Sequence, residues 1–181
     1  MQLLSDRSRV FLRPLVFDDW PDVHAYASRP EVCRFQVWGP NTPEQSRAFV
    51  ELAIASASEE PRTRYAFAVA LAGAHRAIGV GELHVRSHAF RSGEISYVLH
   101  PDCWGRGLGT EVAGLLLRFG FEDLRLHRIY ATCDPRNAAS IRVLQKIGMV
   151  YEGCMRHTLL IRDGWRDSDL YSILDHEWKT S

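Results

Sequence analysis

A glycine-rich segment at residues 100–111, "HPDCWGRGLGTE", carries the strongest chemical signal in the sequence. Its glycines, Gly105, Gly107 and Gly109, occupy alternate positions directly before an apolar pattern of helical spacing. Glycine permits a tight turn and leaves the backbone N–H groups accessible, and a helix N-terminus adds unpaired donors with a partial positive charge. Such a segment is suited to binding a phosphate or diphosphate, and Arg106 can add a charge-assisted contact.

Two other phosphate-binding loops fit this segment poorly. A P-loop needs a lysine followed by serine or threonine after its last glycine, and the segment contains no lysine. A dinucleotide loop needs the spacing G-x-G-x-x-G after an early parallel strand, whereas the spacing here is G-x-G-x-G after strands predicted to form hairpins. A tight strand-to-helix turn without a ligand remains the alternative interpretation of the glycines.

Four stretches of the chain together resemble a known family. "HPDCWGRGLGTE" is followed, after one predicted strand, by "NAASIRVLQKIGM", and this pair resembles the GNAT superfamily of acyl-CoA-dependent N-acetyltransferases. "VFLRPL" near the start and "YEGCMRHTLLIRDGWRDSDLYSIL" near the end are most similar to its branch of ribosomal-protein N-terminal (alanine) acetyltransferases. The resemblance covers nearly the whole chain. It implies that acetyl-CoA is the cosubstrate and that the acceptor is a primary amine, on a protein N-terminus or a small molecule.

The resemblance also implies which residues hold the cofactor. The glycine segment is expected to bind the diphosphate of coenzyme A, and the strand before it to bind the pantetheine arm through main-chain groups. One of those N–H groups, near Val98 or Leu99, is also the expected donor to the oxyanion of the reaction. The implied cofactor-binding residues are Val98, Leu99, His100, Trp104, Gly105, Arg106, Gly107, Leu108, Gly109, Thr110, Asn137 and Ser140.

Acetyl transfer needs a neutral amine, so a general base must remove a proton from an amine that is mostly protonated at neutral pH. Glu94 is the first candidate, because it opens the strand that runs to the glycines, and Glu82 on the adjacent predicted strand is the second. His84 can relay a proton. Many relatives carry a tyrosine that protonates the leaving thiolate where this chain has Leu144. Here Ser140 or a water is the remaining proton donor, or the thiolate leaves unassisted.

In similar enzymes the acceptor enters from the face opposite the cofactor, lined by the early helices and the last hairpin. We therefore expect Phe35, Trp38, Glu82 and His84 to bind the acceptor. The absence of the family tyrosine leaves a second hypothesis open, namely a non-catalytic module that binds acyl-CoA.

Periodicity predicts the elements that position these residues. Alternating patterns predict strands at residues 9–17, 64–71, 76–85, 94–100 and 127–133, and helical spacing predicts helices before residue 30, after Thr42, after Gly109 and from Asn137 to Gly148. The Asp163-Gly164 pair predicts a hairpin between two final strands.

Short connections make the three middle strands antiparallel, and a helical crossover makes the strands at 94–100 and 127–133 parallel. The predicted fold is therefore a single α/β (α+β) domain over residues 1–181. It has a twisted, mostly antiparallel sheet with flanking helices, and in the family its central parallel pair splays apart.

Composition narrows the remaining classes. The formal net charge is zero with 24% charged residues, which disfavours a nucleic-acid partner. The sequence has no apolar run of 18 residues and no apolar leader, so we expect a cytoplasmic protein without a membrane partner. The four cysteines form no C-x-x-C pair, and His84 and His88 lack the H-E-x-x-H pattern, so no metal is expected. The family makes a homodimer an expected assembly.

Overall fold

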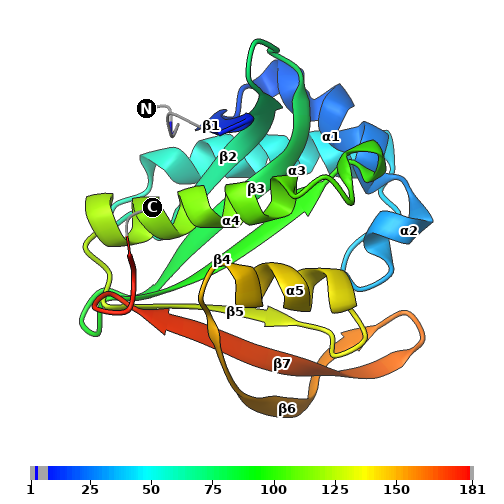
Figure 1. Ribbon diagram of the computed structural model, residues 1–181. Coiled ribbons are helices and arrows are strands. Elements are labelled where there is room, and N and C mark those ends of the chain that lie inside the picture. Colours follow the sequence, from blue (N-terminus) through cyan, green and yellow to red (C-terminus); the bar gives the residue numbers. More distant parts are fainter. Residues whose placement is uncertain (1–2, 4–7, 180–181) are drawn as a thin grey trace.

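The computed structural model describes residue 3 and residues 8–179, which form one seven-stranded sheet with helices on both faces (Figure 1). The elements are β1 (Val10–Pro14), α1 (Trp20–Ala27), α2 (Pro30–Cys33), α3 (Pro43–Ala55), β2 (Arg64–Leu71), β3 (Ala77–Ser87), β4 (Ser92–Leu99), α4 (Leu108–Arg118), β5 (Arg128–Cys133), α5 (Ala138–Lys146), β6 (Val150–Ile161) and β7 (Gly164–Leu174). Short 3-10 turns lie at Phe17–Asp19, Ser56–Ser58 and Pro101–Cys103, and a π-helical turn at Phe119–Asp123 follows α4. No helix in this part of the chain has the length and apolar character needed to cross a membrane.

The strands lie in the order β1-β2-β3-β4-β5-β7-β6, and each neighbouring pair is antiparallel except β4 and β5. This confirms the predicted mixed sheet with a central parallel pair. The pairing of β4 with β5 covers only Ser92–Glu94 opposite Arg128–Tyr130. Beyond Glu94 the two strands diverge, as Figure 1 shows, so the later part of the β4 edge has no strand beside it.

Local sequence signals account for several element boundaries. Thr42 caps α3: its hydroxyl accepts a hydrogen bond from the Gln45 N–H (3.3 Å), and the Gln45 side chain accepts one from the Thr42 N–H (2.9 Å). Gly148, in the left-handed region at φ +85°, follows α5 and ends it as predicted. The hairpin of β6 and β7 turns at residues 162–163, which confirms the prediction from Asp163-Gly164.

Several boundaries differ from the sequence prediction. The strand predicted at residues 9–17 covers only Val10–Pro14, because Phe17–Asp19 forms a 3-10 turn that leads into α1. The early helical region does not simply end before Pro30, because Pro30 begins the short helix α2. Proline fits the first position of a helix, where its missing N–H costs nothing. Strand β4 begins two residues earlier than expected, at Ser92, because its register continues along β3 to Ser87.

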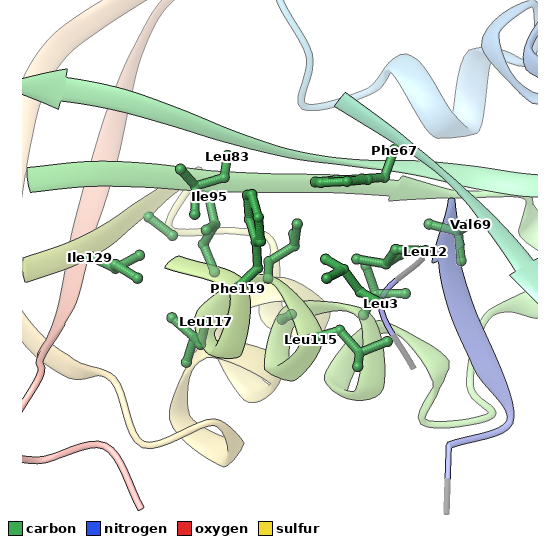
Figure 2. Packing of buried hydrophobic residues seen from close by; sticks show 14 of the residues in the cluster. Leu3, Leu12, Phe67, Val69, Leu83, Ile95, Leu115, Leu117, Phe119 and Ile129 are labelled. Atoms are coloured by element: carbon green, nitrogen blue, oxygen red, sulfur yellow. The ribbon is translucent and has the colours of Figure 1, made fainter. Parts of the chain in front are cut away.

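Two apolar clusters hold the layers together, one on each face of the sheet. The larger packs α4 and the following π-turn on the sheet; in Figure 2, Phe119 and Leu117 face Leu83 and Ile129. The Phe119 ring lies edge-on to Phe67 at 5.3 Å between ring centroids. The smaller cluster packs α1 and α3 on the opposite face. The two clusters therefore fix the glycine segment, which leads into α4, relative to the helices across the sheet.

Candidate active site

The glycine segment forms the turn between β4 and α4. Gly105 (φ +71°) and Gly107 (φ +80°) adopt the left-handed conformation, and Gly107 is the N-cap of α4. A side chain at Gly105 would meet no atom within 4 Å, so the space beside the turn is open. Within the described part of the chain, the N–H groups of residues 105–109 make no hydrogen bond. The turn therefore presents a run of unpaired donors at a helix N-terminus, as an anion site requires.

Three residues expected to contribute to this site already use their N–H groups. The Trp104 N–H donates to the Pro101 carbonyl (2.9 Å), and the Thr110 N–H donates to the Gly107 carbonyl (3.1 Å). The His100 N–H donates to Ile78 on β3 (2.8 Å). The donors available to a diphosphate thus narrow to residues 105–109.

An ion pair with Arg9 offsets the negative charge of Glu111 in the first turn of α4. Arg9 donates to the Glu111 carboxylate and also to the Arg106 carbonyl (2.8 Å). Burial opposes the ionisation of Glu111, but the hydrogen bonds from Arg9 outweigh it and lower the Glu111 pKa. The Arg106 side chain itself is exposed at the mouth of the turn.

Successive residues of β4 direct their main-chain N–H and C=O groups alternately toward β3 and toward the side of β5. The His100 N–H donates to the Ile78 carbonyl on β3, so residues of β4 at even spacing from His100 hydrogen-bond with β3. Val98, which lies opposite Val80, therefore directs its N–H and carbonyl groups toward β3. The pantetheine contact expected of Val98 therefore stays a prediction, since in this register its main-chain groups pair with β3. Tyr97 and Leu99 face the divergent side instead, and the Leu99 carbonyl already accepts a hydrogen bond from Trp104 Nε1 (2.9 Å).

The start of α5 lies on the face of the sheet that carries α4. Asn137 is its N-cap, and its side-chain oxygen accepts a hydrogen bond from the Ser140 N–H (3.2 Å). Leu144, at the family's tyrosine position, is 2% exposed in the larger apolar cluster. No hydroxyl group stands there.

On the opposite face, a cavity of about 640 Å³ lies between the helices α1 and α3 and the strands β3 and β4. Most of its wall is apolar, and the main polar side chains are amides and one carboxylate. It is lined by Val23, Tyr26, Ala27, Gln36, Val37, Trp38, Gly39, Asn41, Gln45, Ala48, Phe49, Leu52, Val80, Glu82, Ser96, Tyr97 and Val98. The β4 segment from Ser96 to Val98 thus belongs both to the cavity and to the part of β4 that has left β5.

The two candidate bases lie in different surroundings. Glu82 lines the cavity, and its Oε1 binds Arg64 Nη2 at 2.6 Å. His84 Nε2 lies 3.9 Å from the same oxygen, and burial lowers the His84 pKa even though Glu82 counteracts that effect. Glu94, one strand row further along, does not line the cavity and pairs with Arg86 at 2.6 Å.

The aromatic residues expected at the acceptor site are separated. Trp38 lines the cavity, whereas Phe35 contacts the guanidinium groups of Arg34 and Arg136, at 5.1 and 5.7 Å from its ring centroid. Trp165, on the last hairpin that was also expected to line the acceptor side, belongs to a second cavity of about 280 Å³ beside the loop before α5.

Sequence patterns did not identify the cavity residues on α1 and α3, among them Tyr26, Gln45 and Phe49. Their helical spacing indicated only that they face inward, which is also true of residues in a filled core. The last hairpin, which was expected on this side, supplies Arg162 near its tip, and Arg162 donates to the carbonyls of Trp38 and Gly39 at 3.2 and 2.6 Å. Among residues 3 and 8–179, no group of three His, Cys, Asp or Glu side chains could hold a metal ion.

Comparison with known proteins gives a consistent picture. A family model of the acetyltransferase (GNAT) domain matches residues 9–150. The uncharacterized N-acetyltransferase YnaD of Bacillus subtilis (strain 168) is 34% identical over 172 residues, which cover 94% of this chain and 96% of the relative. The spermidine N(1)-acetyltransferase of Escherichia coli (strain K12) is 29% identical over 170 residues, 93% of this chain and 88% of the relative. Among solved structures, Mycobacterium smegmatis RimJ in complex with CoA-disulfide superimposes with a TM-score of 0.82 at 26% identity, over 95% of this chain and 85% of that one.

Proposed function

The chain belongs to the GNAT acetyltransferase family, and from this premise we propose that it transfers the acetyl group of acetyl-CoA to a primary amine. One observation carries the proposal. The unpaired N–H groups of residues 105–109 lie on one side of the sheet, the apolar cavity lies on the other, and both adjoin the segment of β4 that has separated from β5. A thioester laid along this segment reaches the acceptor cavity directly.

The residues present fit coenzyme A. The diphosphate binds the N–H groups of residues 105–109, with Arg106 as an added cation. The pantetheine amides pair with the open main-chain groups of Tyr97 and with the Leu99 N–H, in the manner of an added strand. The same N–H groups are the candidate donors to the oxyanion that forms when the amine attacks the thioester.

Glu82 is the better candidate for the base. Both contacts of its carboxylate with Arg64 are made by Oε1, and within the described chain Oε2 makes no hydrogen bond. Oε2 can therefore accept the amine proton, directly or through a water. His84 is neutral at pH 7, because its pKa is lowered, and so can accept a proton from the same water. The C–N bond then forms, the C–S bond breaks, and the thiolate leaves without a covalent enzyme intermediate.

The cavity favours an acceptor with an apolar body next to its amine. Among the described lining residues Glu82 is the one carboxylate, and Arg64 already pairs with it. The second ammonium of a polyamine would find no free carboxylate there, and burying an unpaired charge is costly. A peptide N-terminus or a hydrophobic monoamine is compatible with Trp38, Phe49 and the amide groups of the wall.

Thiol release from acetyl-CoA tests the proposal. The acceptor panel should contain peptides beginning with Ala, Ser or Met, together with hydrophobic monoamines, spermidine and an aminoglycoside. We expect turnover with a peptide or a monoamine. Binding of CoA without turnover on any acceptor would instead support the non-catalytic module, and lack of CoA binding would refute the proposal.

A matched pair of variants tests the base. Glu82→Gln is expected to lower kcat at pH 7 by about a hundredfold, since general bases contribute roughly 10²–10⁴ in rate. Glu94→Gln keeps the same size and polarity outside the cavity and is expected to retain nearly full activity. The opposite pattern would restore Glu94 as the base.

A further inference from the structure

The Tyr97 hydroxyl is a buried polar group without a partner. Its oxygen is inaccessible to solvent and makes no hydrogen bond with any described residue. A buried hydroxyl left unpaired destabilises the folded state, so each such group in a folded protein calls for an explanation.

The Tyr97 ring lies against the first turn of α4, on the side of that turn that meets α5. A Cβ on Gly109 would lie 3.3 Å from Tyr97 Cε2 and 3.6 Å from a methyl group of Val143 on α5. The third glycine of the segment therefore leaves room for the hydroxyl end of this ring. The ring is thus placed at the divergence of β4 and β5, on the face that carries α5.

Ser140 is the group that can complete this arrangement. Burial raises the Tyr97 pKa to about 12, and the Ser140 side chain partly opposes that rise, although the two hydroxyl groups do not meet hydrogen-bond geometry. The phenol therefore stays protonated at neutral pH and acts as a donor. Transfer of its proton to a thiolate, whose ordinary pKa is near 8.5, would be uphill, so Tyr97 is not itself the acid.

Resting on the acetyltransferase function proposed above, we propose that Tyr97 is a positioning residue that donates a hydrogen bond to Ser140 Oγ and turns the Ser140 hydroxyl toward the sulfur of CoA. As the C–S bond breaks, the thiolate accepts the Ser140 hydrogen bond and is afterwards protonated by water. The amine proton leaves separately through Glu82 or water. Tyr97 and Ser140 together replace the hydroxyl that Leu144 does not provide.

Tyr97→Phe tests the inference because it removes only the hydroxyl. We expect kcat to fall about threefold to tenfold, the equivalent of one hydrogen bond, with the KM for acetyl-CoA unchanged. The melting temperature should stay equal or rise, because an unpaired buried polar group is lost. A purely structural role predicts a lower melting temperature and no selective loss of kcat.

A double-mutant cycle completes the test. Ser140→Ala should lower kcat at least as much as Tyr97→Phe, and adding Tyr97→Phe to it should cause no further loss. Tyr65→Phe, which alters a tyrosine of the same apolar cluster on β2, is the control and should keep wild-type kcat. Wild-type kcat in Tyr97→Phe, or additive losses in the double variant, would overturn the inference. Failure of the proposed function looks different, since the wild-type protein itself would then release no thiol.

Discussion

Gly105→Ala should weaken coenzyme A binding through the backbone alone. Gly105 lies at φ +71°, and a Cβ there meets no atom within 4 Å, so the substitution introduces no clash within the described chain. An L-residue held in this conformation costs about 1–2 kcal/mol relative to its preferred conformation. The turn is exposed and can relax when it is empty, but a diphosphate bound to its N–H groups requires the left-handed conformation.

The free-energy cost of this backbone conformation should therefore appear mainly as weaker binding of CoA. A cost of about 1–2 kcal/mol corresponds to a roughly fivefold to thirtyfold rise in the Kd for CoA. Isothermal titration calorimetry with CoA measures this Kd directly, and thermal denaturation without ligand measures how much of the cost falls on folding.

Gly73→Ala is the matched control. Gly73 also has a positive φ, +80°, a Cβ there would likewise meet no atom within 4 Å, and the residue lies in the turn between β2 and β3, away from the site. The substitution should lower stability by the same cost, roughly 2–8 °C in Tm, with the Kd for CoA unchanged. A Kd within twofold of wild type in Gly105→Ala would refute the role given to this turn.

Two further predictions concern the C-terminal hairpin. Arg162→Met should raise the KM for the acceptor and leave the KM for acetyl-CoA unchanged, because Arg162 holds the carbonyls of the loop that carries Trp38; equal KM values for the acceptor in steady-state assays would contradict this. Hydrogen bonds from Arg128 and Ser172 lower the Glu152 pKa to about 2, so their stabilisation is complete above about pH 5 and is lost as the pH falls toward 2. After allowance for solvent screening, these hydrogen bonds stabilise the folded state by about 1 kcal/mol. Urea unfolding should show Glu152→Gln less stable than wild type at pH 7 but equal to it near pH 2.

Sequence patterns recovered most of the architecture because they reflect local physics. The alternation at residues 64–71 matches β2 without error, and Thr42 and Asn137 cap their helices as predicted. The helical crossover between two strands required a parallel pair, which the structure contains. The tight turn before α4 was likewise predictable from the sequence, because the left-handed conformation of its glycines is one that glycine itself permits.

The sequence could not show which of two carboxylates, Glu82 or Glu94, reaches the acceptor cavity. Glu82 and Glu94 share one face of the sheet, because Glu82 lies opposite Ser96 and His84 lies opposite Glu94. Alternation fixes that shared face but not how far the helices α1 and α3 extend over it. The cavity ends at the row of Glu82, so only the packing of those helices separates the two residues.

The sequence by itself determined the family, the order of the elements and a turn of glycines with free N–H groups before a helix. Those features depend on neighbouring residues along the chain. The tertiary structure decided which main-chain groups of β4 face the open side, which carboxylate meets the cavity, and that Tyr97 lies near Ser140 with its hydroxyl unpaired. These depend on strand register and on contacts between residues far apart in the sequence, such as Tyr97 and Ser140, which local periodicity does not encode.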